Sequence, residues 1–144
     1  MKNFKDLTDD ERAQLLSFPA YVSLLASTSG NGLDKQEKDA AVKLSHIKTF
    51  SSDPQLKDFY KQVEENFEKK ITHLDAQLPH GKKERKEAIM QELHKLDKVL
   101  KQLDPALAKL FKKSMESFRH HVSKAHQNVL EYFILPLPIE GITD

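Results

Sequence analysis

The sequence predicts an all-α protein, folded as a single-domain bundle of about six helices. Over long stretches, apolar residues recur at alternating steps of three and four, which is the spacing of one face of an α-helix. Helix-start signals precede several of these stretches, and the alternating β-branched runs typical of strands are missing. A chain of 144 residues is long enough for one domain with its own hydrophobic core.

The first helical segment, residues 8–29, divides into two short helices. Thr8 and Glu11 have the spacing of a capping box, in which each side chain accepts a hydrogen bond from the other residue's backbone. Pro19 suits the first turn of the second helix, where its missing N–H costs nothing. Two glycines follow and end that helix.

Four longer helices are expected after this segment, over residues 35–50, 54–78, 83–103 and 105–133. Two of them open with an Asp-Pro pair, which combines an N-cap with proline at the first helical position. The last three are long, and their short connections predict that they run antiparallel. In the last one, the four-three alternation continues from Leu107 to Tyr132, as in a coiled coil.

The C-terminal tail, residues 134–144, reads "ILPLPIEGITD" and is expected to be extended, because prolines two positions apart exclude a helix. Its apolar residues predict that it packs along the bundle.

Composition narrows the classes of function. The chain has no cysteine, which excludes disulfides, thiolate metal sites and a cysteine nucleophile. Its first residues lack the apolar core of a signal peptide, and the longest weakly charged stretch is interrupted by Pro19. We therefore expect a cytoplasmic protein without a transmembrane segment. No nucleophile with a neighbouring base is recognisable, so we expect no enzymatic activity.

The loop "SGNGLDKQEKDAA", residues 29–41, allows two interpretations. Asp34 and Glu37 have capping-box spacing, and such a cap stabilises a helix by about 1 kcal/mol. The same two carboxylates are candidate ligands for a divalent metal, although hard cations usually recruit more oxygen ligands. The cap is the favoured interpretation, and no other cofactor is expected.

The first third of the chain, through this loop, resembles the opening of TerB-like domains, the helical family associated with tellurite resistance. Those domains have a short helix, a proline, an apolar helix and then an Asp-Gly-x-Ile-Asp-x-x-Glu loop. Leu33, Asp34 and Glu37 match that pattern, whereas Gly30 stands where the family has its leading Asp and Asn31 where it has Gly. The resemblance implies a bacterial stress-associated scaffold, with a divalent metal at the acidic loop.

A second candidate metal site lies on the last two helices. His94 and Asp97 are one turn apart on one helix, as are Glu116 and His120 on the other. The four could meet if these helices pack antiparallel. However, neither pair matches the Glu-x-x-His pattern of di-iron bundles.

Residues 79–124 hold 12 basic and 6 acidic side chains, which makes this segment the basic part of a chain with net charge +1. This charge predicts a surface that binds an anionic partner, either a membrane or a nucleic acid. Its candidate residues are Lys82, Lys83, Arg85, Lys86, Lys112, Lys113 and Arg119. Nucleic acid is the less favoured partner, because no aromatic residues interleave with the basic ones.

The wide apolar stripe of the last helix also predicts a homodimer through the last two helices. Taken together, the sequence favours a non-enzymatic helical interaction or scaffold protein whose protein partner is unknown. A metal-binding helical protein and a basic-surface binder are the alternatives.

Overall fold

The computed structural model describes residues 2–27 and 32–125. These residues contain six α-helices and two short 3₁₀ helices and no β-strand, which confirms the all-α fold. The α-helices are α1 (Asp9–Leu16), α2 (Phe18–Ala26), α3 (Lys35–Ser51), α4 (Lys57–Gln77), α5 (Lys82–Leu100) and α6 (Pro105–Ser123). The 3₁₀ helices are η1 (Phe4–Asp6) and η2 (Pro54–Leu56).

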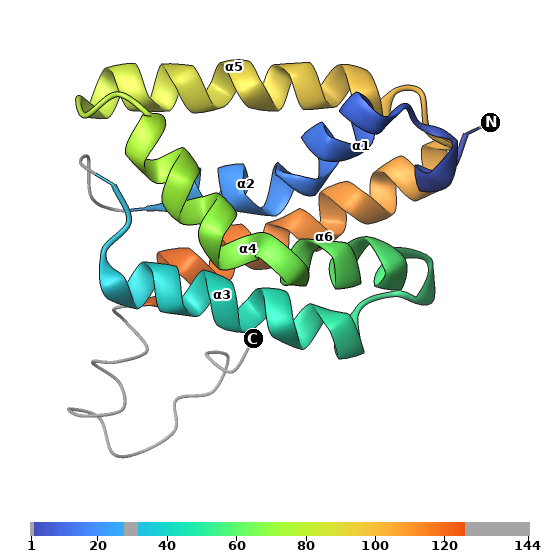
Figure 1. Ribbon diagram of the computed structural model, residues 1–144, viewed down its shortest axis with the longest axis horizontal. Coiled ribbons are helices and arrows are strands. Elements are labelled where there is room, and N and C mark those ends of the chain that lie inside the picture. Colours follow the sequence, from blue (N-terminus) through green and yellow to red (C-terminus); the bar gives the residue numbers. More distant parts are fainter. Residues whose placement is uncertain (1, 28–31, 126–144) are drawn as a thin grey trace.

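The short helix α2 lies at the centre of the fold and contacts all five other α-helices. Its sequence, "FPAYVSLLA", contains no charged residue, and six of its nine residues are buried. A helix that is apolar on most sides is stable only where other elements surround it. The long helices therefore pack around α2, with α5 along one edge of the molecule and α3 along the opposite edge (Figure 1).

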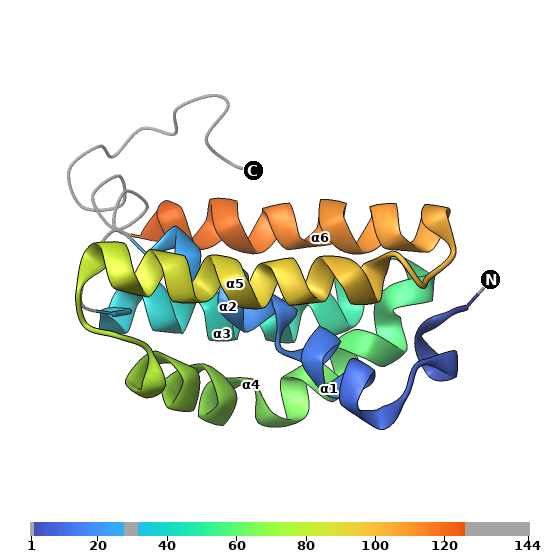
Figure 2. The same cartoon turned by 90° about the horizontal axis from the view of Figure 1, so that it is seen from above.

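The three long helices α4, α5 and α6 alternate in direction along the chain, as expected from their short connections (Figures 1 and 2). They share α2 as a packing partner: α5 lies against α2 and α1, while α6 lies against α2 and α3. Because α5 lies at the edge, one of its sides meets the core and the rest is open to solvent.

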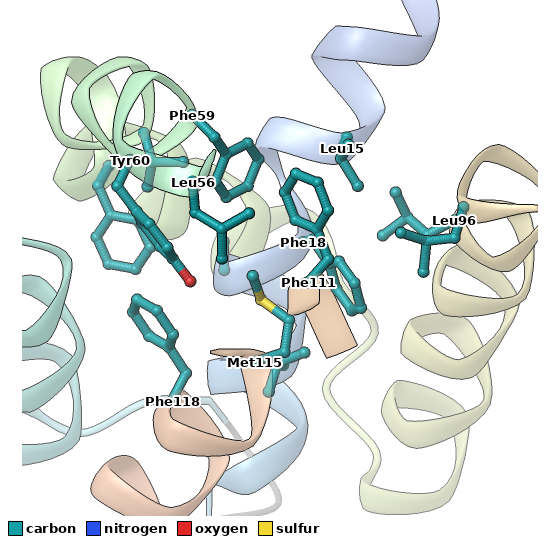
Figure 3. Packing of buried hydrophobic residues seen from close by; sticks show 14 of the residues in the cluster. Leu15, Phe18, Leu56, Phe59, Tyr60, Leu96, Phe111, Met115 and Phe118 are labelled. Atoms are coloured by element: carbon teal, nitrogen blue, oxygen red, sulfur yellow. The ribbon is translucent and has the colours of Figure 1, made fainter. Parts of the chain in front are cut away.

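Aromatic rings from α4 and α6 form the middle of the core (Figure 3). The Phe59 ring meets those of Phe4, Tyr60 and Phe111 edge-on, with centroids 5.5, 5.0 and 4.8 Å apart. Such edge-to-face pairs add stability beyond the burial of their area. The four-three spacing of apolar residues in α4 and α6 produces this alignment.

Local start signals act as the sequence predicted. Thr8 and Glu11 form a reciprocal capping box at the start of α1. Asp53 and Asp104 accept hydrogen bonds from the backbone N–H groups of Gln55 and Leu107, at 2.9 and 3.3 Å. Each aspartate thus caps the helical segment that its Asp-Pro pair was expected to begin.

One helix end differs from expectation, and another lies outside the described residues. The helix expected over 83–103 ends at Leu100, and the residues after it form a turn. Beyond the turn, Leu103 forms a bridge with Lys2. The Lys2 carbonyl accepts a hydrogen bond from the Asp104 N–H at 2.9 Å. Within the range 105–133, α6 extends to Ser123, a turn follows at Lys124, and Ala125 is again helical. The rest of that range beyond Ala125 and the tail 134–144 lie outside the described residues.

Candidate functional site

The loop before α3 is built as a helix cap. The Asp34 carboxylate accepts a hydrogen bond from the Glu37 N–H at 2.9 Å, and Glu37 Oε1 accepts one from the Asp34 N–H at 3.1 Å. The same Glu37 oxygen accepts a hydrogen bond from the Ser27 hydroxyl at 3.1 Å, and Glu37 is fully buried. The predicted capping box is therefore confirmed, and it also ties α3 to the end of α2.

An ion pair between buried Arg85 and half-buried Asp75 holds this loop against the turn between α4 and α5. Asp75, near the end of α4, forms an ion pair with Arg85 and accepts a hydrogen bond from the Leu33 N–H at 3.3 Å. Arg85 also donates to the backbone carbonyls of Asp75 and Pro79, at 3.2 and 3.4 Å. The last carbonyls of a helix lack partners within the helix, and Arg85 supplies donors at this end of α4.

Arg85 is only 4 % exposed, whereas the other six residues of the predicted anionic-partner surface are exposed. Its charge is used inside the protein, against Asp75. The sequence gives no local signal for this pairing, because the two residues are ten positions apart and lie on opposite sides of a turn.

The remaining residues of the predicted basic surface are divided between two helices. Lys82, Lys83 and Lys86 are exposed on the first turns of α5, and Lys113 is exposed on α6. The other two candidate residues on α6 form ion pairs: Lys112 with Asp97 at 3.5 Å and Arg119 with Glu116 at 2.9 Å.

The structure does not bring together the four residues of the second candidate metal site. Asp97 lies between Lys101 and Lys112, with ion-pair distances of 3.3 and 3.5 Å, and these lysines lower the pKa of its carboxyl. Glu116 pairs with Arg119. Over residues 2–27 and 32–125, no group of three or more His, Asp or Glu side chains is placed to hold a metal ion.

A pocket of about 380 Å³ lies between the end of α2 and the start of α5. Its floor is apolar and its rim is basic. The lining residues are Leu24, Leu25, Ser27, Lys82, Arg85, Lys86, Ile89 and Met90. We call this hollow the α2–α5 pocket.

A shallow, open groove continues from this pocket along α5, and the two share Lys86 and Met90. Its lining residues are Lys86, Glu87, Met90, Gln91, Leu93, His94, Lys95, Asp97 and Lys98. We call it the α5 groove. Lys86, Met90, Leu93 and Asp97 follow one another at steps of four, three and four, so they share one flank of the helix.

The electrostatics of the α5 groove favour a negatively charged partner. Among the charged lining residues, Lys86, Lys98 and Glu87 form no ion pair with any residue that the structure describes. Lys95 pairs with Glu92, and Asp97 is already neutralised by two lysines. The unpaired groups thus carry two positive charges and one negative charge. Met90 is 48 % exposed and adds apolar surface to the groove. The groove thus combines exposed apolar surface with excess positive charge. The sequence did not predict this combination, because it depends on which flank of α5 the core leaves uncovered.

Comparison with known proteins adds no relative. No protein-family model, no curated protein and no solved structure matches the chain. Among the helices of the described residues, none is both long enough and apolar enough to cross a membrane.

Proposed function

We propose that this chain is a non-enzymatic interaction protein that binds an acidic amphipathic helix of a protein partner along the α5 groove. The observation that carries the proposal is the pairing of exposed Met90 and half-buried Leu93 with the unpaired Lys86 and Lys98 on one open helix. Amphipathic helices bind such grooves through apolar residues at helical spacing, while charge complementarity selects the partner.

The α5 groove alone is too small for a stable homodimer. A helix of 19 residues such as α5 is about 28 Å long at a rise of 1.5 Å per residue. One flank of it offers on the order of 300 Å², given a contact width of about 10 Å between packed helices. A stable dimer usually needs about 800 Å² per partner, so the homodimer through the last two helices would need surface beyond the α5 groove.

Three other buried polar groups have structural roles. Glu37 is engaged in the cap of α3, and Arg85 holds the end of α4. The Tyr60 hydroxyl lies 2.5 Å from the Ser114 hydroxyl in the core, and burial raises the pKa of that phenol. These groups stabilise the fold. A scaffold role of the kind that the resemblance to TerB-like domains implies is compatible with the proposal.

The test uses a defined probe in place of the natural partner. We would measure, by fluorescence anisotropy, the binding of a labelled 18-residue peptide with leucines on one helical face and glutamates on the other. A second peptide carries lysines in place of the glutamates. We expect saturable binding of the acidic peptide and at least tenfold weaker binding of the basic one, because the groove has excess positive charge.

Two charge-introducing variants locate the binding site. Met90→Glu places a carboxylate in the middle of the groove, and we expect it to weaken binding of the acidic peptide at least tenfold. Phe50→Glu is the matched control, because Phe50 is also apolar and is 71 % exposed, but lies on α3. Equal binding by both variants, or equal binding of both peptides, would contradict the proposal.

A further inference from the structure

We infer that the α2–α5 pocket is a separate binding site for a small anionic amphiphile, a molecule with one carboxylate or phosphate head and a short apolar body. This site does not depend on the proposed protein partner. It would bind its ligand even if the α5 groove bound no peptide.

The walls of the pocket supply the contacts for the apolar body. Leu24 and Leu25 come from the last turn of α2, and Ile89 and Met90 face them from α5. The volume of about 380 Å³ lies within the range of roughly 300–1,000 Å³ that is common for small-molecule sites. Such sites are mostly apolar, with a few placed polar groups that fix the orientation of the ligand.

The rim supplies the positive charge for the head. Lys82 and Lys86 are exposed there, and neither forms an ion pair with another described residue. Asp75 neutralises Arg85, so the net positive charge at the rim comes from these two lysines. A single anionic head group would be held by both.

One buried hydrogen-bond donor of the pocket lining, the Arg85 Nε, has no acceptor among the described residues. The Arg85 side chain is 5 % exposed. Most buried donors in proteins are satisfied, because an unpaired one costs the full penalty of its desolvation. Because the Nε atom is itself buried, binding of the head group is assigned to Lys82 and Lys86, which are exposed at the rim.

Two lysines on α5 allow the pocket and the groove to be tested independently. Lys82 lines only the pocket, and Lys98 lines only the groove. The two residues are 16 positions apart on one helix, or about 24 Å, which exceeds the screening length of about 8 Å at physiological salt. Lys82→Glu and Lys98→Glu change the net charge equally, so each variant is the control for the other.

The experiment is a titration of the full chain, with labelled methyl groups, followed by nuclear magnetic resonance. The probes are octanoate, octyl phosphate and the neutral octanol. We expect saturable shifts of the Leu24, Leu25 and Ile89 methyl signals with at least one anionic probe, and at least tenfold weaker binding of octanol. Lys82→Glu should weaken the anionic probe at least fivefold, whereas Lys98→Glu should change its dissociation constant less than twofold.

Three results would overturn this inference: no saturable shift of these methyl signals, octanol binding as tightly as the anionic probes, or equal weakening by both variants. The head group that binds more tightly, carboxylate or phosphate, identifies the ligand class. Acidic-peptide binding in the same two variants tests the α5 groove separately, because Lys98→Glu should weaken it and Lys82→Glu should not.

Discussion

Removal of the Asp75 carboxylate should destabilise this protein more than removal of any exposed acidic side chain. In Asp75→Ala, the Arg85 guanidinium stays buried at 4 % exposure without a counter-charge, and the Leu33 N–H loses its acceptor. Breaking a buried ion pair on one side costs about 3–5 kcal/mol. Because the Asp75 side chain is itself 26 % exposed, water partly compensates, and we expect the lower end of this range.

A loss of about 3 kcal/mol in the free energy of unfolding should lower the melting temperature by roughly 10 °C in a chain of this length. The assay is thermal and urea unfolding followed by circular dichroism at 222 nm. Glu116→Ala is the matched control, because the Glu116–Arg119 pair is exposed on both sides, at 65 % and 56 %. Exposed pairs contribute at most about 1 kcal/mol, so this variant should unfold close to the wild type.

A second variant separates the ion pair from the general effect of mutation. Replacing both partners, as in Asp75→Leu with Arg85→Met, removes the buried charge together with its counter-charge and should be less destabilising than Asp75→Ala alone. If the free energy of unfolding of Asp75→Ala were within about 1 kcal/mol of the wild-type value, Arg85 would not depend on Asp75 to compensate its charge. The Asp75–Arg85 pair would then not stabilise the turn between α4 and α5.

Three further predictions concern the loop and the core. Gly32→Ala should cost about 1–3 kcal/mol in urea unfolding, because Gly32 has a φ of +125° and a Cβ there would lie 2.9 Å from Asp75 Oδ1; an unchanged midpoint would exclude this conformation. Asp34→Ala should cost about 1 kcal/mol through loss of the cap on the Glu37 N–H, and addition of Ca²⁺ or Mn²⁺ should not change that difference if the carboxylate acts as a cap. Burial raises the folded-state pKa of Tyr60 above its ordinary value of 10, so its contribution to stability is complete below pH 10 and is lost as the pH rises above it; Tyr60→Phe should reduce this alkaline loss, measured as the pH dependence of the urea midpoint.

Features of the fold that depend on neighbouring residues could be predicted from the sequence. The capping box of Thr8 and Glu11 and that of Asp34 and Glu37 each join residues three positions apart, so the pattern alone contains the contact. The uncharged sequence of α2 was the available signal for its central place, since a helix without a polar face must be covered on most sides.

Features that depend on long-range packing could not be predicted. Arg85 resembles its exposed neighbours Lys83 and Lys86 in the sequence, and only the turn between α4 and α5 places it against Asp75. The exposure of Met90 likewise depends on α5 lying at the edge of the fold, where the core covers Ile89 but not the adjacent residue. The candidate binding surfaces therefore follow from the tertiary arrangement, and no short motif encodes them.

The measurement that tests the proposed function most directly is the affinity of the acidic amphipathic peptide for Met90→Glu relative to Phe50→Glu. Both variants replace an exposed apolar side chain by a carboxylate, and surface substitutions of this kind usually change stability by less than about 0.5 kcal/mol. Met90→Glu should bind the acidic peptide at least tenfold more weakly than the wild type, and Phe50→Glu should bind it with the affinity of the wild type. Equal affinity of the two variants would contradict the assignment of the α5 groove as the binding surface.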